Sequence, residues 1–116
     1  LPVVYAGGAK ALRESTADRG GLLVGRQAYM EKLEREGYSR EEMTKQDRKL
    51  FQAYAEQWRA KYTPEYAKEM KENDEHSLPR ERVNGIVMNI DRWYELFDVK
   101  FGNILYLTPE TRARIW

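Results

Sequence analysis

The chain has 116 residues and a mass of 13.7 kDa, which suits one domain with a modest hydrophobic core. Its 20 Lys and Arg residues nearly balance 19 Asp and Glu residues, and the resulting net charge of +1 gives no electrostatic basis for binding nucleic acid or an anionic membrane. There is no Cys, which excludes disulfides and thiolate metal sites, and no stretch approaches the roughly 20 apolar residues of a membrane span.

Helical spacing of apolar residues begins near the start of the chain. The pattern from Leu12 to Leu33 predicts one helix or two abutting helices, ending near Gly37. Gly20 and Gly21 fall inside this pattern and weaken a helix by about 1 kcal/mol each relative to Ala.

A capping box predicts the start of the next helix. Ser39 has the side chain of an N-cap residue, and Glu42 follows at the position from which a carboxylate reaches back to the cap. Thr44 is a second candidate cap, for a helix that we expect to run to about Lys61. The apolar stripe of this helix consists of Phe51, Tyr54, Ala55, Trp58 and Tyr62.

Shorter helices are predicted in the second half of the chain. Thr63 is suited to cap the first, with Pro64 in its first turn, and a loop follows at residues 73–79. The second begins near Arg80. Asn89 is expected to cap another, whose apolar residues are Trp93, Leu96 and Phe97.

The last part of the chain has a different pattern. Residues 100–107 are mostly apolar and we expect them to be extended, whereas Thr108, Pro109 and Glu110 predict a short final turn. No repeat, low-complexity tract or internal boundary is visible. The sequence therefore predicts a single all-α domain over residues 1–116.

Several kinds of chemistry lack the residues that they need. The glycine pairs do not form a GxGxxG or GxxxxGK[ST] phosphate loop, so the sequence does not indicate nucleotide binding. With one His and no Cys, the chain cannot assemble a conventional zinc site by itself. No nucleophilic Ser paired with His stands in a recognisable setting.

Three charged groupings remain, and each also has a plain structural explanation. Glu14 and Asp18 are four residues apart, so on a helix their carboxylates share a face and need solvent or a cation to offset their repulsion. Asp74 is two residues before His76 and is placed to orient the imidazole and favour its protonated form. Arg82 has a planar fork that suits a carbonyl or carboxylate. On spacing alone, solvated surface residues are the favoured explanation of all three.

Four stretches, taken together, change this balance. They read RESTADRGGL, AEQWRAKYTPEYA, NDEHSLPRERVNG and FDVKFGNILYLTPETRARIW. Their order resembles the carboxyl end of the neprilysin-like zinc endopeptidases, a family that includes the endothelin-converting enzymes and related bacterial oligopeptidases. The resemblance runs roughly from Gly7 to Trp116. It implies the helical carboxyl-terminal part of a thermolysin-like (gluzincin) catalytic domain.

The resemblance assigns the first charged pair to a metal centre. The family motif typically reads Glu-Asn-Ile-Ala-Asp-x-Gly-Gly, and here it is ESTADRGG, so Glu14 matches the third zinc ligand. Asp18 matches the carboxylate that holds one of the zinc-ligating histidines in its tautomer and orientation. Ser15 and Thr16 replace the usual Asn and Ile.

The other matches concern the substrate. His76 matches the histidine that donates to the oxyanion formed as the peptide carbonyl is attacked, and Asp74 matches the carboxylate that steadies this histidine. Arg82 matches the arginine that binds a substrate carbonyl just beyond the cleaved bond. Trp58 resembles a residue near the apolar subsite for the side chain after that bond, although it fits a plain core position equally well.

The HExxH segment of the family is absent, and with it two zinc ligands and the general-base glutamate. We therefore expect the chain, which starts at Leu1 rather than Met, to be the carboxyl-terminal part of a metalloendopeptidase that hydrolyses peptides and oligopeptides. Zinc would belong to the parent enzyme, and the chain alone would neither hold zinc stoichiometrically nor cleave peptides. The lack of the Cys found near the end of animal members favours a bacterial relative.

The resemblance also implies partners and a location. The chain's partner would be the missing amino-terminal part of the same enzyme, and apolar surface left uncovered by that part would drive self-association. The parent would be extracellular or in the cell envelope, either periplasmic or membrane-anchored.

A function of another class remains open, namely a small helical interaction module without catalytic chemistry. That hypothesis predicts that Glu14, His76 and Arg82 lie apart. The peptidase hypothesis predicts that they converge on one concave face. Their positions in a structure discriminate between the two.

Overall fold

A computed structural model describes residues 8–73 and 78–114, with side chains described from residue 14 onward. Within these residues the chain forms five α-helices, one 3₁₀ helix and no strand. They are α1 (Gly8–Arg35), α2 (Arg40–Gln57), α3 (Pro64–Asn73), α4 (Pro79–Val87), α5 (Asp91–Phe97) and η1 (Pro109–Thr111). The predicted all-α class is confirmed for the part of the chain that the structure describes.

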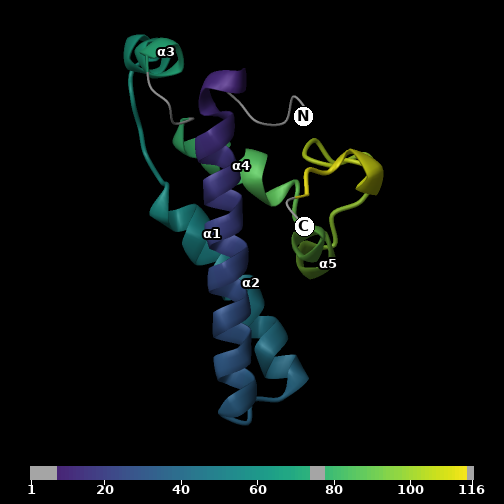
Figure 1. The fold of residues 1–116 in the computed structure, drawn as a ribbon. Helices are drawn as coiled ribbons and strands as arrows, with labels where there is room; N and C mark the ends of the chain where they lie inside the picture. The colour runs from purple at the N-terminus through teal and green to yellow at the C-terminus, as the bar shows by residue number, and fades with distance from the viewer. Residues whose placement is uncertain (1–7, 74–77, 115–116) are drawn as a thin grey trace.

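The long helix α1 organises the arrangement (Figure 1). Helix α2 runs back along the half of α1 that ends at Arg35, and α4 packs against the other half. Helix α5 packs against α2, while α3 stands at the opposite end of the molecule from the turn between α1 and α2 (Figure 1). The molecule is elongated, with extents of 49 × 28 × 25 Å.

Helix α1 is a single helix, so the glycine pair inside it does not divide it. Its end is closed at Gly37, where the sequence predicts it. The Gly37 N–H donates to the Glu34 carbonyl and the Tyr38 N–H donates to the Leu33 carbonyl, each at 3.1 Å. Gly37 has a φ of 83°, a left-handed conformation that suits a residue without Cβ, and this geometry satisfies the last helix carbonyls.

The capping box at the start of α2 is confirmed. The Ser39 hydroxyl accepts from the Glu42 N–H at 3.1 Å, and the Glu42 carboxylate accepts from the Ser39 N–H at 2.9 Å. The expectation that Thr44 caps a helix is wrong, because α2 already begins at Arg40. Thr44 lies inside α2, where its hydroxyl donates to the Arg40 carbonyl at 2.9 Å.

We expect Ser39→Ala to lower the free energy of unfolding by about 1 kcal/mol, because it removes the acceptor for a helix N–H that has no intrahelical partner. Thr44→Ala is the matched control. It removes a hydroxyl that caps nothing and should change stability by less than about 0.5 kcal/mol. Urea unfolding followed by circular dichroism measures both variants. Equal losses would contradict the assignment of Ser39 as the cap.

Helix α2 ends at Gln57, earlier than the predicted end near Lys61. Trp58 follows as the C-cap, and its backbone N–H donates to carbonyls of the preceding turn. The Trp58 ring lies against the guanidinium of Arg82 in α4. Because α2 ends at Gln57, Tyr62 lies beyond the helix and outside its apolar stripe. The helix thus ends beside a tertiary contact that the apolar periodicity does not reveal.

The predicted starts of α3 and α4 are confirmed to within one residue. The Tyr66 N–H donates to the Thr63 hydroxyl at 3.1 Å, as an N-cap requires. Pro79 occupies the first position of α4, where its missing N–H is not needed. The N–H of the preceding residue, Leu78, donates to the Glu81 carboxylate at 3.2 Å.

The expectation that Asn89 caps α5 is wrong, because the N-cap is Ile90. Asn89 is fully buried instead. Its Nδ2 donates to the Gly85 carbonyl at 2.8 Å, and its Oδ1 accepts from the Ala113 N–H at 2.6 Å. Both ends of the amide are thus paired, as a buried polar group requires, and Asn89 ties α4 to the carboxyl-terminal segment.

Residues 100–107 form turns rather than the extended stretch that we expected. The Lys100 N–H donates to the Asn103 side chain at 2.8 Å, and the N–H groups of Asn103 and Tyr106 make backbone turn bonds of 3.0 Å. Gly102 has a φ of 102°, which these turns need and most other residues avoid. The short turn predicted after this segment is confirmed as η1.

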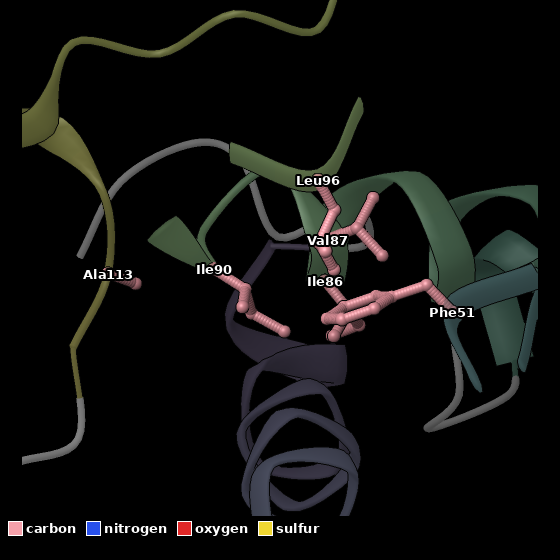
Figure 2. Packing of buried hydrophobic residues seen from close by; sticks show 6 residues of the cluster. All are labelled: Phe51, Ile86, Val87, Ile90, Leu96 and Ala113. Carbon is pink, nitrogen blue, oxygen red and sulfur yellow. The ribbon is translucent and has the colours of Figure 1, made fainter. Parts of the chain in front are cut away.

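The hydrophobic core lies where α1, α2, α4, α5 and the carboxyl-terminal segment meet. Its buried members are Phe51, Ile86, Val87, Ile90, Leu96 and Ala113 (Figure 2). Leu22 and Leu23 of α1 pack against this cluster. Since full burial of a large apolar side chain contributes about 1.5–3 kcal/mol, the cluster holds α1, α2 and α4 in fixed relation. These three helices carry most of the predicted site residues.

Candidate functional site

An ion pair joins α1 to α4 at the centre of the candidate site. Arg82 donates from Nε to Oδ2 of Asp18 at 2.8 Å and from Nη2 to Oδ1 at 2.7 Å. The two residues are 64 positions apart, and their side chains are only 17% and 19% exposed. Two parallel charge-assisted hydrogen bonds fix the orientation of the guanidinium as well as its distance. The structure therefore brings two of the predicted site residues into direct contact.

The guanidinium of Arg82 also lies over the ring of Trp58, with its central carbon 3.9 Å from the ring centroid. A cation placed in this way is attracted to the indole face by about 0.5–2 kcal/mol. Trp58 is half-buried and lines a pocket of about 360 Å³, together with Tyr62, Pro79 and Arg80 among others. It lies outside the buried core cluster, beside a charged group and an open pocket.

Tyr54 is a member of the site that the sequence reasoning missed. Its hydroxyl donates to the main-chain carbonyl of Arg82 at 2.8 Å. Burial, and then the negative charge of Asp18, raise the pKa of Tyr54 to about 12, against opposing effects of Arg82 and Trp58. The phenol is therefore a neutral hydrogen-bond donor at any physiological pH. The one available signal was its position one helical turn before Trp58 on the same stripe.

Glu14 lies on α1 one turn before Asp18, and its side chain is half-buried. The two carboxylates thus share a helix face, as their spacing predicts. Among the described residues, no group of three or more His, Cys, Asp or Glu side chains is gathered as a metal site. The chemistry of the donor is suitable, since a carboxylate oxygen is an ordinary zinc ligand. A carboxylate at position 14 is therefore chemically suited to be a zinc ligand.

Asp74 and His76 lie outside the described residues, between the end of α3 at Asn73 and the start of α4 at Pro79. The predicted convergence of His76 with Glu14 and Arg82 therefore stays a prediction. The structure brings together the elements that carry the other matched residues, α1, the end of α2 and the first turn of α4.

The family of the chain is indicated by comparison with known proteins. The model of peptidase family M13 matches residues 3–113. No solved structure matches the chain.

The curated relatives reported below are named neutral endopeptidase or neprilysin. The neutral endopeptidase of Lactococcus lactis subsp. lactis (strain IL1403) is 29% identical over 111 residues, which cover 96% of this chain and 16% of the relative. Neprilysin of Homo sapiens is 29% identical over 115 residues, covering 97% and 15%. The neutral endopeptidase of Lactobacillus helveticus is 40% identical over 67 residues, covering 58% and 10%. The chain thus spans 16% or less of the length of these relatives.

Proposed function

The chain belongs to peptidase family M13, and from this premise we propose that it supplies part of the catalytic centre of a zinc metalloendopeptidase that hydrolyses peptides and oligopeptides. The observation that carries the proposal is the Asp18–Arg82 ion pair. It joins the helix that bears the matched metal ligand to the helix that bears the matched substrate-binding arginine. The guanidinium of Arg82 is held by two hydrogen bonds and by the indole of Trp58, so its position between the two helices is fixed.

In this proposal Glu14 is one zinc ligand, and Asp18 orients a histidine ligand supplied by another part of the enzyme. Each Asp18 oxygen accepts one hydrogen bond from Arg82. A carboxylate oxygen has a second acceptor site, so Asp18 retains the capacity to accept from an imidazole N–H. Zinc, when bound, acts as a Lewis acid on the peptide carbonyl and lowers the pKa of water to about 7.

Arg82 is suited to hold a substrate carbonyl because only one edge of its fork is used by Asp18. Nε and Nη2 donate to the carboxylate. Nη1 takes no part in this ion pair. Since the fork is rigid and planar, fixing one edge also fixes the direction of the other. The free edge would donate to the carbonyl just beyond the cleaved bond, and Trp58 would border the adjoining subsite.

His76 and Asp74 complete the proposal. The imidazole would donate to the oxyanion of the transition state, where a preorganised donor has its largest effect, and the Asp74 carboxylate would steady it. Both assignments rest on the match of their sequence to the family pattern.

The chain alone would not be an active enzyme. It offers a single matched zinc ligand, and its 16% share of the Lactococcus relative leaves most of that enzyme without a counterpart here. We propose that the remainder supplies the HExxH helix, the general base and the rest of the peptide-binding site of a gluzincin fold. That remainder would also cover exposed apolar groups such as Phe101 and Ile104, which are 88% and 99% exposed and would favour self-association of the isolated chain.

The proposed location of the parent enzyme is extracellular or in the cell envelope, as in the neprilysin-like enzymes that the sequence resembles. No helix in the described part of this chain is both long and apolar enough to cross a membrane. The lack of Cys favours a bacterial source, and two of the relatives above are bacterial.

We expect Glu14→Ala, made in the intact enzyme, to lower zinc affinity by at least about 100-fold, since loss of even an outer partner of a ligand costs about 10–100-fold. Zinc per mole of protein, measured by mass spectrometry after dialysis against a weak chelator, gives the result independently of activity. Glu31→Ala is the matched control, because Glu31 is an exposed carboxylate on the same helix. Full zinc retention by Glu14→Ala would refute the proposed ligand.

A further inference from the structure

Arg82 is held at its main chain as well as at its side chain. The Tyr54 hydroxyl, from α2, donates to the Arg82 carbonyl at 2.8 Å. The guanidinium meets Asp18 of α1 and stacks on Trp58 at the end of α2. Tyr54 and Trp58 are four residues apart, so α2 presents both to Arg82 from one face. The first turn of α4 is thereby fixed between two helices.

We infer that Tyr54 is a positioning residue for substrate recognition: its hydroxyl fixes the main chain of Arg82 and so the direction in which the free edge of the guanidinium faces the peptide. The substrate part of this inference rests on the proposed function. Tyr54 itself touches neither metal nor peptide and acts only through Arg82.

The hydroxyl is suited to this role because it stays protonated. A phenolate could not donate to a carbonyl, and burial together with the Asp18 charge raises the pKa of Tyr54 to about 12. The ring of Trp58, one helical turn after Tyr54, lies under the guanidinium of the same arginine. The Tyr54 hydroxyl therefore lies among the groups that orient Arg82.

A substrate-binding arginine needs this kind of support at the backbone. The fork must be held within a fraction of an ångström of its productive position, and a long side chain transmits any shift of its own main chain. The guanidinium of Arg82 is bound to Asp18 of α1, and its main-chain carbonyl is bound to Tyr54 of α2. A movement of α4 relative to α2 would therefore turn the free edge of the guanidinium away from the peptide. The tyrosine hydroxyl opposes that movement.

The first test uses NMR on the 116-residue chain and does not depend on peptidase activity. Tyr54→Phe keeps the ring and removes only the hydroxyl. We expect hydrogen exchange of the Arg82 Nε–H to rise about 3–10-fold, the factor that loss of one ordinary hydrogen bond allows. The upfield shift that the Trp58 ring gives to the Arg82 side chain should decrease as well.

Tyr29→Phe is the matched control. Tyr29 donates its hydroxyl to the Gln46 side chain at 3.1 Å, so it also makes a part-buried hydrogen bond between two helices, but not to Arg82. It should cost similar stability in thermal unfolding and leave the Arg82 signals unchanged. Equal changes of those signals in both variants, or no change in Tyr54→Phe, would overturn the inference.

The second test uses peptide hydrolysis by the intact enzyme. Arg82 contacts the peptide before and during reaction, so Tyr54→Phe should raise KM about 3–10-fold and leave kcat within about twofold. Tyr29→Phe should alter neither. A signal change by NMR without a change in KM would overturn the role in substrate recognition. Absence of hydrolysis by the wild-type enzyme would instead refute the proposed function, while the NMR result on Arg82 would stand.

Discussion

His76→Ala, made in the intact enzyme, is expected to lower turnover of a peptide substrate about 100- to 1000-fold while zinc stays bound. The imidazole is proposed to donate to the oxyanion, whose negative charge develops only in the transition state. Loss of such a donor therefore lowers kcat and kcat/KM by similar factors and leaves substrate binding almost unchanged. Steady-state kinetics and zinc content, measured on the same preparation, check both parts of the prediction.

His76→Gln is the conservative companion, because an amide N–H can still donate from a nearby position. It should recover part of the turnover that His76→Ala loses. Glu14→Ala provides the contrast, since it should lose zinc. If His76→Ala and Glu14→Ala lost zinc equally, the separate roles given to the two residues would be wrong.

The local features of the fold could be predicted because short-range chemistry determines them. Ser39 with Glu42 begins α2, Thr63 caps α3, and Gly37 closes α1 in the left-handed conformation that glycine favours. Each signal involves residues only a few positions apart. In these three cases the residues that make the signal also make the contacts, so no distant group decides the outcome.

Two of the wrong predictions share one physical cause: a distant group pairs with a side chain that reads as a local signal. Asn89 has the side chain of a helix cap, but its amide pairs with Gly85 and Ala113 inside the core. Trp58 continues the apolar stripe of α2, but its ring lies under Arg82 and the helix ends there. No pattern along the chain indicates which distant group will be present.

For the candidate site, the sequence proposes residues but not the contacts among them. Spacing and resemblance single out Asp18 and Arg82, but they pair Asp18 with a histidine of the metal site. The contact that the structure shows is with the fork of Arg82. Tyr54 reads as an apolar member of a helix stripe, and only its hydrogen bond to Arg82 reveals its part in the site.

A second charged cluster, which the sequence did not indicate at all, joins α1, α2 and α5. Asp47 of α2 is buried, with 1% of its side chain exposed. It accepts from Arg26 of α1 at 2.8 Å through both oxygens and from Arg92 of α5 at 3.0 Å. One carboxylate thus joins three helices. Its removal should therefore lower the free energy of unfolding more than the removal of a surface ion pair would.

Asp47→Ala is expected to lower the free energy of unfolding by about 3 kcal/mol, because it removes the counter-charge of Arg26 and leaves Arg92 paired only with Glu95. The value is near the low end for a broken buried pair, since the Arg26 and Arg92 side chains remain 24% and 35% exposed and keep some contact with water. Asp98→Asn is the matched control. It removes an exposed carboxylate whose partner is Lys100, and it should cost less than about 1 kcal/mol.

The effect of Asp47 should also depend on pH in a defined direction. Burial acts to raise the pKa of Asp47, but the hydrogen bonds and charges of Arg26 and Arg92 outweigh it and hold the pKa below the usual value of an aspartate. A carboxyl whose pKa is lower in the folded than in the unfolded chain stabilises the fold above the unfolded value and loses that effect as the pH falls through the folded value. The stability difference between wild type and Asp47→Ala should therefore be full at neutral pH and shrink in acid. Chemical denaturation at a series of pH values measures it, and a difference that grew on acidification would show that Asp47 does not stabilise the fold as an ionised partner of the two arginines.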